Sequence, residues 1–406
     1  MTTNTESYSQ KELVTDHVLL RLPVKSLFRF KCVCKSWHDL IKSSSFIKKH
    51  FNSESNRLRL MVCKLGVNYK KDLGERSLDM LGERSLDMFL LNEKIFAGCI
   101  PTNQRIYRCE DVGDFGCIYG PINGIFLLEK GHYIDNVRFA WWNPATKECR
   151  LIPRIHFEVQ QYFQDNNRSL GIGIDLVNQD YKVIWHRTFW DDMTCDVFPK
   201  VYAAVYSTKN DSWKFLEPEH SHLCQIFISQ NCTYMNGVYY WISTSQRFCN
   251  EDNVYFIRTF DFATELFGEM TGPPIPGEHW ASLMLRGGSL AAMSCDGVTK
   301  AMTANYGIWV RIGENNWIKV YTVNPPIPSH YPIGIWEYDK FLFELEQTCR
   351  LVFYDQTVKE VTSLGFHFYD LSCSSNWAIS YKESLVPIKN EKPTEKDNAE
   401  YFFTKY

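Results

Sequence analysis

The chain has 406 residues and a formal net charge of only −3. This length leaves room for a small module beside a large domain. The near-neutral balance argues against a nucleic-acid or anionic-membrane surface, so we expect protein partners, with no nucleic acid and no membrane. Aromatic residues make up 15% of the chain. Together with many Val and Ile they favour strands, so most of the chain should be β.

The start of the chain and its cysteines predict a compartment. Residues 1–10 are polar and lack the apolar run of a signal peptide, and no apolar stretch reaches the roughly 20 residues that span a bilayer. The 14 cysteines are scattered, and without a secretory signal we expect them to stay reduced. The predicted location is the cytoplasm, with the nucleus as a second option.

The first organised unit is helical and runs from about residue 11 to 50. Its apolar residues recur mostly every three or four positions, at Leu22, Leu27, Phe30, Val33, Trp37, Leu40 and Ile41. Pro23 suits a first helical position because its φ is fixed and its missing N–H would be unpaired there anyway. About forty residues form only a marginal core, so these apolar side chains imply a docking partner or packing against the rest of the chain.

From about residue 56 the pattern changes to short aromatic and β-branched runs broken by turn residues. One type of hairpin recurs at 139–151, 201–213, 257–267 and 351–361, with a weaker copy at 307–317. A second type lies between these, at 120–128, 171–184, 235–241 and 335–343. Two hairpins per interval predict four-stranded propeller blades.

Counting hairpins in this way gives about five blades. Pairing of residues 57–64 with 377–388 would complete a sixth and close the ring. A β-sandwich or an open meander is the alternative. We therefore predict an α+β chain of two domains, a small helical module followed by a propeller-like β domain of about six blades.

An eight-residue segment occurs twice in tandem, at 73–80 and 81–88, as Leu-Gly-Glu-Arg-Ser-Leu-Asp-Met. The simplest interpretation is a duplication accepted in a surface loop, since lengthening a loop adds little closure entropy. A functional role for the repeat is the alternative.

The helical stripe carries a family resemblance. Residues 22–41, Leu-Pro-Val-Lys-Ser-Leu-Phe-Arg-Phe-Lys-Cys-Val-Cys-Lys-Ser-Trp-His-Asp-Leu-Ile, closely resemble the F-box of plant F-box proteins. The resemblance implies a three-helix module over residues 8–50 that binds a Skp-type adaptor and through it a cullin, with a helix break near Cys34. The implied adaptor-binding residues are Leu22, Pro23, Leu27, Phe30, Val33, Cys34, Trp37, Leu40 and Ile41. The first helix departs from the family, because Ser9-Gln10-Lys11 stands where a Leu-Pro pair is usual.

The charges of the helical segment leave two interpretations open. Residues 21–50 hold many Lys and Arg and one acid, Asp39. They either form a solvated face or also steer an acidic adaptor.

The β region resembles the F-box-associated domain. The matching phrases are Asn-Pro-Ala-Thr-Lys-Glu-Cys-Arg-Leu-Ile-Pro at 143–153, residues 178–184 and 205–214, and Tyr-Lys-Glu-Ser-Leu-Val-Pro-Ile at 381–388. This implies a domain over 56–388, followed by a charged tail at 389–406. Residues 381–385 and 43–50 look most like the S-locus F-box proteins of pollen, whose targets are S-ribonucleases of the style.

No catalytic or cofactor motif competes with this interpretation. His220, His222 and Cys224 alternate as metal ligands on a strand could, but a fourth ligand is missing and we expect loop residues. Gly171-Ile-Gly-Ile-Asp and Gly287-Gly288 lack the rest of a nucleotide-binding loop. We expect a non-catalytic receptor without cofactor or metal. An interaction protein that sequesters its partner without ligase coupling, or a hydrolase built on the propeller, are the alternatives.

The target should bind the loops of the β domain that adaptor docking leaves free. Aromatic and charged residues in the longest irregular stretches are the candidate anchors: Tyr162, Trp190, Asp191, Asp192, His222, Arg247, Glu251, Asp252 and Trp280. The acids among them, with Glu217 and Glu219, would suit a basic ribonuclease, or else only keep the loops soluble.

Overall fold

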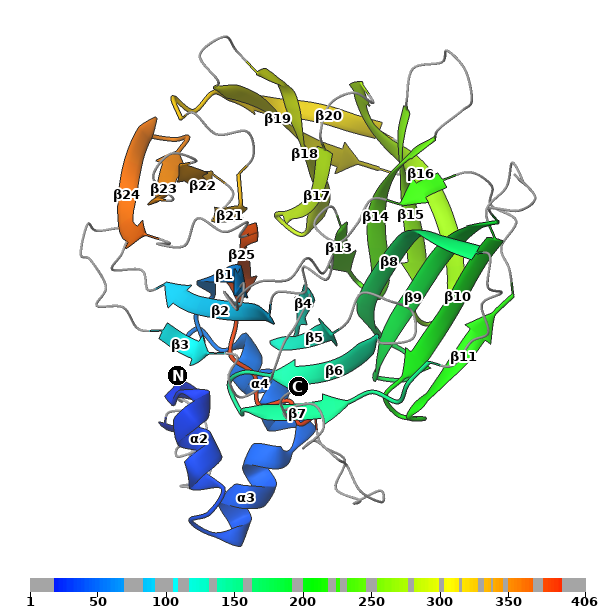
Figure 1. Ribbon diagram of the computed structural model, residues 1–406. Coiled ribbons are helices and arrows are strands. Elements are labelled where there is room, and N and C mark those ends of the chain that lie inside the picture. Colours follow the sequence, from blue (N-terminus) through cyan, green and yellow to red (C-terminus); the bar gives the residue numbers. More distant parts are fainter. Residues whose placement is uncertain are drawn as a thin grey trace, which may run out of the picture. The chain divides into compact units, whose positions relative to one another are not determined.

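The computed structural model describes residues 18–68, 83–91, 105–108, 117–130, 137–155, 163–191, 200–217, 224–226, 232–245, 254–276, 281–298, 303–313, 316–327, 332–336, 339–345, 350–367 and 375–388. The chain divides into two compact units, one made of Met1–Ile152 and Asp370–Tyr406, the other of Pro153–Tyr369. Each unit is described by itself. Helices occupy the start of the described chain and strands the remainder (Figure 1).

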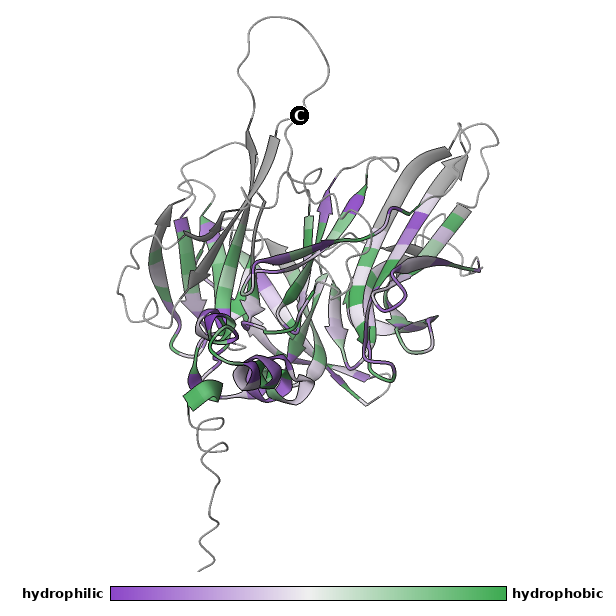
Figure 2. Ribbon diagram, turned by 90° about the horizontal axis from the view of Figure 1, so that it is seen from below, coloured by the Kyte–Doolittle hydropathy of each residue, from purple (hydrophilic) through white to green (hydrophobic). Residues whose placement is uncertain are grey.

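The helical module opens the first unit. It contains η2 (Leu19–Arg21), α2 (Val24–Phe30), α3 (Lys35–Lys42) and α4 (Ser44–Asn52). The predicted break near Cys34 is confirmed, because Cys34 is extended (φ −158°) and stands just before α3. Pro23 lies one residue earlier than predicted, at the N-cap of α2, with φ −59°. Ser43 caps α4 by accepting a hydrogen bond from the Phe46 amide. Hydrophobic and hydrophilic residues share each helix (Figure 2), as an amphipathic stripe requires.

Two antiparallel sheets complete the first unit. One has the order β25-β1-β2-β3 and consists of Ser375–Tyr381, Arg59–Asn68, Glu83–Leu91 and Arg105–Arg108. The other has the order β4-β5-β6-β7 and consists of Cys117–Ile122, Ile125–Lys130, Arg138–Asn143 and Glu148–Leu151.

The second unit holds four further antiparallel sheets. The first contains β8 (Phe163–Asp175), β9 (Asp180–Asp191), β10 (Lys200–Ser207) and β11 (Ser212–Leu216). The next contains β12 (Cys224–Ile226), β13 (Cys232–Met235), β14 (Val238–Ser245), β15 (Val254–Asp261) and β16 (Leu266–Pro276). The last two contain β17 (Ala281–Arg286), β18 (Ser289–Val298), β19 (Ala304–Ile312) and β20 (Asn316–Val323), then β21 (Gly334–Trp336), β22 (Lys340–Leu345), β23 (Arg350–Asp355) and β24 (Glu360–His367).

The sheets confirm the predicted fold class, a small helical module followed by a β-propeller domain. The described residues form six separate antiparallel sheets, each a short meander of hairpins. A two-sheet sandwich would not divide in this way.

The hairpins of the first type, which we call the outer hairpins, are β6–β7, β10–β11, β15–β16 and β23–β24. They share one turn design, which explains why their sequences recur. Each turn ends on a non-glycine residue with positive φ, at Lys147, Asp211, Glu265 and Lys359. In three of the four hairpins an Asn or Asp opens the turn, and its side-chain oxygen accepts hydrogen bonds from the amides two and three residues later. The sequence repeat is therefore a repeat of turn chemistry.

Two hairpins of the second type, β4–β5 and β13–β14, use a different turn, whereas the β8–β9 hairpin shares the outer design, with Asp175 accepting from the Val177 and Asn178 amides and Gln179 at positive φ. The pairs Asn123-Gly124 and Asn236-Gly237 both have positive φ at the two central residues. Such turns match the twist of the adjoining strands, and Asn-Gly is the favoured pair for them. This turn explains two of the four hairpins of the second type, those at 120–128 and 235–241.

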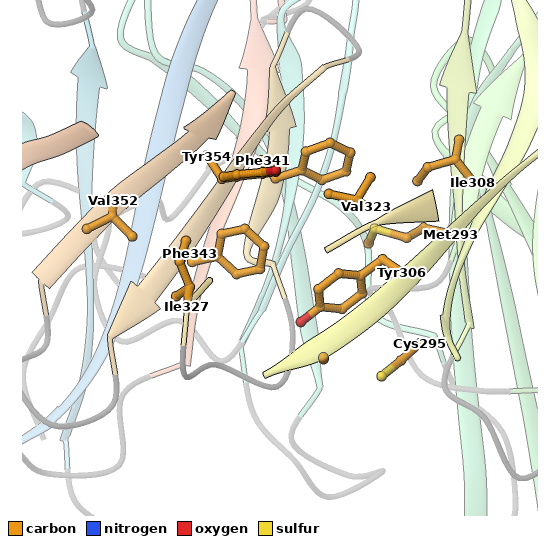
Figure 3. Close-up of a cluster of buried hydrophobic side chains, with 11 residues drawn as sticks. Met293, Cys295, Tyr306, Ile308, Val323, Ile327, Phe341, Phe343, Val352 and Tyr354 are labelled. Atoms are coloured by element: carbon orange, nitrogen blue, oxygen red, sulfur yellow. The ribbon is translucent and has the colours of Figure 1, made fainter. Parts of the chain in front are cut away.

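Neighbouring sheets of the second unit bury an apolar layer between them (Figure 3). Side chains from β18, β19 and β20 face those from β22 and β23, and the buried members are Met293, Cys295, Ala304, Tyr306, Ile308, Val323, Ile327, Phe341, Phe343, Val352 and Tyr354. A second layer with Tyr240, Ile242, Ile257, Leu283 and Ala292 joins the β14–β16 sheet to the β17–β20 sheet. Such layers hold blade against blade in a propeller.

The two ends of the β domain meet in one sheet, as predicted. Strand β25 pairs antiparallel with β1, from Arg59↔Tyr381 to Leu65↔Ser375. The prediction placed this pairing at 377–388, whereas residues 382–388 form no strand and continue along another path. The closing strand therefore ends at Tyr381.

The interpretation of the tandem repeat as a surface loop is wrong for its second copy. Residues 83–88 belong to β2, which lies between β1 and β3 in the closing sheet. The first copy lies outside the described residues. The duplication thus supplies a strand of the propeller.

Candidate functional site

The helical module has its own core, and that core includes part of the β domain. Its buried members are Leu19, Val24, Leu27, Ile41, Phe46 and Leu385. Partly buried side chains surround them: Leu20, Leu22, Phe30, Trp37, Leu40, Ile47 and Ala145. Leu385 and Ala145 come from the β domain, so the forty-residue module does not bury its stripe alone.

The nine predicted adaptor residues divide by exposure. Leu27 and Ile41 are 0% exposed and belong to the supporting core. Leu22, Phe30, Trp37 and Leu40 are half-buried at its rim, and the Phe30 and Trp37 rings pack 5.4 Å apart. Pro23, Val33 and Cys34 are exposed. The available surface is thus the rim and the segment between α2 and α3.

Val33 is the most exposed apolar residue of the described module, with 62% of its surface accessible. Phe28 is also exposed (40%), and the Lys31 ammonium lies 4.8 Å from its ring centroid. Phe28 lies off the apolar stripe, so helical periodicity did not single it out. An isolated aromatic residue among lysines and arginines was the only signal that could have found it.

The helical module also exposes many basic residues. The exposed ones are Arg21, Lys25, Arg29, Lys35, Lys42, Lys48 and Lys49, and Asp39 contacts the neighbouring His38. Lys31 is half-buried, and burial lowers its pKa, an effect that Glu148 partly offsets. Apart from Lys31, these lysines and arginines are therefore exposed to solvent, and their role in steering an adaptor stays a prediction.

The α4 side of the module is covered by residues 382–388, which we call the C-terminal segment. Leu385 is 2% exposed inside the helical core. The Asn56 side-chain amide donates to the Glu383 carbonyl at 2.8 Å, and the Glu383 carboxylate pairs with Arg59 at 3.0 Å. The Lys382 ammonium lies 5.5 Å from the Phe51 ring centroid.

The β domain holds the other side of the C-terminal segment, through Asn143. This residue is fully buried at the end of β6, and its amide donates to the carbonyls of Ser384 and Val386, each at 3.0 Å. Its side-chain oxygen also organises the β6–β7 turn. The two sequence phrases at 143–148 and 381–388 therefore contact one another.

His50, in α4, is buried inside the module. Its Nε2 donates to the Leu22 carbonyl at 2.8 Å, and its Nδ1 is buried with no hydrogen-bond partner among the described residues. Burial lowers the pKa of His50, because protonation would place a second N–H in a site without an acceptor. The neutral ring is the form that fits.

The predicted target-binding residues stay a prediction. Seven of them, Tyr162, Asp192, His222, Arg247, Glu251, Asp252 and Trp280, lie outside the described residues. Trp190 and Asp191 form the end of β9, in register with Gln164 and Phe163 of β8. The structure does not describe their side chains.

Metal and membrane sites have no support in the described part of the chain. It contains no group of three His, Cys, Asp or Glu residues that could hold a metal ion, and no helix there is long and apolar enough to cross a membrane. His220 and His222 of the discounted metal motif are outside the described residues.

Comparisons with known proteins agree with this geometry. Residues 12–49 match the model of the F-box domain, and residues 121–388 match that of the F-box associated beta propeller domain. An F-box/kelch-repeat protein of Arabidopsis thaliana is 25% identical over 367 residues, covering 87% of this chain and 90% of that protein. An F-box protein of the same plant is 21% identical and covers 95% of this chain and 86% of its own length.

Among solved structures, an α-L-arabinofuranosidase of Fusarium graminearum is similar, with a TM-score of 0.37 and 7% identity over 61% of this chain and 79% of that one. A likeness at this level carries no argument about function.

Proposed function

We propose, from the premise that this chain belongs to the F-box associated beta propeller family and carries an F-box before the propeller, that it is the substrate receptor of an SCF-type ubiquitin ligase. The F-box binds a Skp-type adaptor and thereby a cullin, and the β domain binds the protein to be modified. The receptor itself is non-catalytic. It acts by bringing target and ligase together, which converts an encounter into a local reaction.

One observation carries the adaptor half of this proposal, namely the asymmetry of the F-box. Its α4 side is covered by the C-terminal segment, whereas Val33 and Phe28 are exposed near the α2–α3 junction. Exposed apolar residues on a module rich in exposed lysine and arginine are typical of a docking surface for an acidic partner.

A single substitution tests the docking surface. We expect Val33→Glu to abolish capture of a Skp-type adaptor, because a carboxylate would be buried in an apolar contact. Val358→Glu is the matched control, since Val358 is 59% exposed on the β23–β24 turn. Both variants should melt like the parent protein. Undiminished adaptor recovery with Val33→Glu would refute the assignment of this surface.

Trp37→Ala should also abolish adaptor capture, but Trp37 is half-buried and packs on the module's core. Trp37→Ala would lower both adaptor binding and the stability of the module, so Val33→Glu is the sharper test of binding. A parent protein that never co-purifies with adaptor and cullin would favour a receptor that sequesters its partner without ligase coupling.

For the target we propose a basic protein, and specifically the S-ribonucleases of self-incompatibility. The support is the resemblance of residues 43–50 and 381–385 to S-locus F-box proteins, together with the acidic loop residues. Changing Asp191, Asp192, Glu251 and Asp252 to Lys should weaken S-ribonuclease capture at low salt and leave adaptor capture intact, with the difference shrinking at high salt. Equal capture by both proteins at every salt concentration would return the choice of target to the wider family. Cytoplasm or nucleus is the compartment this proposal requires.

A further inference from the structure

We propose that the C-terminal segment is a strut that holds the F-box in one orientation on the β domain, and that Asn56 and Leu385 are positioning residues for ubiquitin transfer. The proposal rests on the proposed function and adds to it a mechanical role that the adaptor and target surfaces do not provide. All the contacts that carry it lie within the first compact unit.

The strut is anchored in the F-box by an apolar and a polar contact. Leu385 sits in the core between the helices and is 2% exposed. The Asn56 amide, in the connection between α4 and β1, donates to the Glu383 carbonyl. Asn56 is itself buried, so this hydrogen bond is shielded from water and costly to lose.

Several contacts also anchor the strut in the β domain. Asn143 donates to two of its carbonyls, and the Glu148 carboxylate accepts from the Ile388 amide at 3.2 Å. The backbone also passes very close to Gly124, where an added Cβ would come within 2.5 Å of the Lys382 carbonyl oxygen and 2.6 Å of Ser384 Cβ. This turn position admits only glycine for steric reasons as well as for its φ of +76°.

Two segments therefore hold the F-box on the β domain, one as the chain connection and the other, the strut, through non-covalent contacts, and they are bonded to each other. The first, at 53–58, leads from α4 into β1; the second is the strut, which continues from β25, the partner of β1. The Asn56–Glu383 hydrogen bond and the Arg59–Glu383 ion pair link the two. A single flexible linker would let the F-box rotate, whereas two bonded segments do not.

A fixed orientation matters for ubiquitin transfer. The ligase delivers ubiquitin from one point on the adaptor–cullin side, so only lysines that the β domain presents near that point react quickly. When the F-box is held in one orientation, the effective concentration of the ligase-bound ubiquitin is high at a few lysines. When the F-box can rotate, the probability of ubiquitin transfer is spread over many lysines. The strut thus selects which lysines are modified.

The test uses the full chain with Asn56→Ala and Leu385→Ala combined, and Asn52→Ala with Leu58→Ala as the matched control. Asn52 and Leu58 are the same residue types, exposed, and placed at the same end of the module. In a reconstituted ligase with adaptor and cullin, the readout is self-modification, measured as the rate at each lysine by mass spectrometry.

We expect the parent and the control to modify a narrow set of lysines. The loosened variant should modify a broader set, with the rate at the favoured lysines reduced about 5- to 10-fold and adaptor affinity within about 2-fold of the parent. An unchanged lysine pattern and rate in the loosened variant would overturn the proposal. A merely structural role would lower the yield of folded protein without redistributing the modified lysines.

Hydrogen exchange on the free protein separates this proposal from the proposed function. In the loosened variant the amides of α4 should exchange faster while those of β4–β7 are unchanged, whether or not a ligase is present. If the parent protein fails to bind an adaptor but this exchange pattern is seen, the proposed function fails and the strut stands. Unchanged α4 exchange removes the strut. Should Leu385→Ala prevent folding, Asn56→Ala alone carries the same measurements.

Discussion

The two sides of the F-box differ in the solvent exposure of their apolar residues. On the α4 side, Leu27, Ile41 and Leu385 are closed into a core that the chain completes by itself. Near the α2–α3 junction, Val33 and Phe28 are left to solvent. One side of the module is buried against the rest of the chain, and the other side is exposed to solvent. The covered side is thus an intramolecular interface, and the exposed side is the one that we propose for adaptor docking.

Removing the covered side altogether should have the largest effect. We expect truncation after residue 374 to abolish cooperative unfolding of the first unit, because it removes β25 and the C-terminal segment and leaves β1 an unpaired edge. Circular dichroism melts would show this, with truncation after residue 388 as the control that keeps both. A soluble protein with an undiminished transition would show that the closing strand is dispensable.

Leucine and valine substitutions sharpen the comparison between the two sides. Leu27→Ala should destabilise the protein by about 2–5 kcal/mol, as buried Leu→Ala changes do. Val33→Ala should stay within about 0.5 kcal/mol, since the side chain is mostly exposed. Urea unfolding of the two variants measures both values. Equal losses would mean that Val33 is part of the core.

The tandem repeat allows a subtler perturbation of the closing sheet. Residues 75–80 repeat 83–88, so the first copy could replace the second opposite residues 63–68 of β1. A shift of eight residues is even and keeps each side chain on its face. It would, however, place residues 81–83, with a glycine and a glutamate, opposite 60–62 of β1 instead of Phe89, Leu90 and Leu91.

We therefore expect Leu86→Pro to be partly rescued by the first copy. Proline removes a ladder hydrogen bond from a central strand and should cost about 3 kcal/mol or more. In the full chain the loss should be smaller than in a protein with one copy deleted, and Leu78→Pro should have almost no effect. The melting temperature of each variant, compared with that of its own parent protein, decides the matter. Equal losses in both backgrounds would rule out the alternative register.

Acid should weaken the covered side through His50, the smallest of these effects. The pKa of His50 is lowered in the folded protein, so the unfolded chain takes up the proton first as pH falls below about 6.5. The stability contribution is complete above that pH and is lost as pH falls towards the folded-state pKa. His50→Gln, whose amide can still donate to the Leu22 carbonyl, should flatten this loss between pH 7.5 and 5.5 in urea titrations. Parallel losses in both proteins would contradict it.

A buried histidine elsewhere gives a background to that measurement. Burial, and then the charge of Arg258, lower the pKa of His186 to about 3. Its contribution has the same sign as that of His50 and is present in both proteins, so only the difference between them reports on His50.

The features that the sequence predicted correctly are local ones. The Asn-Gly turns and the Asn- or Asp-led outer turns are set by residues next to one another, so the hairpins could be located from the sequence. The break near Cys34 came from the family resemblance, because periodicity alone runs through it. Even the β1–β25 pairing was foreseen, from the need to complete a last blade.

The features that were missed depend on contacts between residues far apart in the sequence, or on which of two identical segments forms the strand. Asn56 meets Glu383 across 327 positions, and no periodicity reports such a contact. The two copies of the repeat are identical, so only the residues that follow each copy, 89–91 in one case and 81–83 in the other, distinguish the strand. Phe28 escaped notice because it lies off the stripe. Two of the predicted target residues, Trp190 and Asp191, lie at the end of strand β9 and not in a loop, and the other seven lie outside the described residues.

The position of Leu385 also sets an order of events during synthesis. The helices of the F-box leave the ribosome first, but the leucine that completes their core is made only after the strands of every other blade. A chain released early would carry the helices without Leu385 and β1 without its partner β25. Neither the core of the helical module nor the sheet that contains β1 can be completed until translation has passed residue 388.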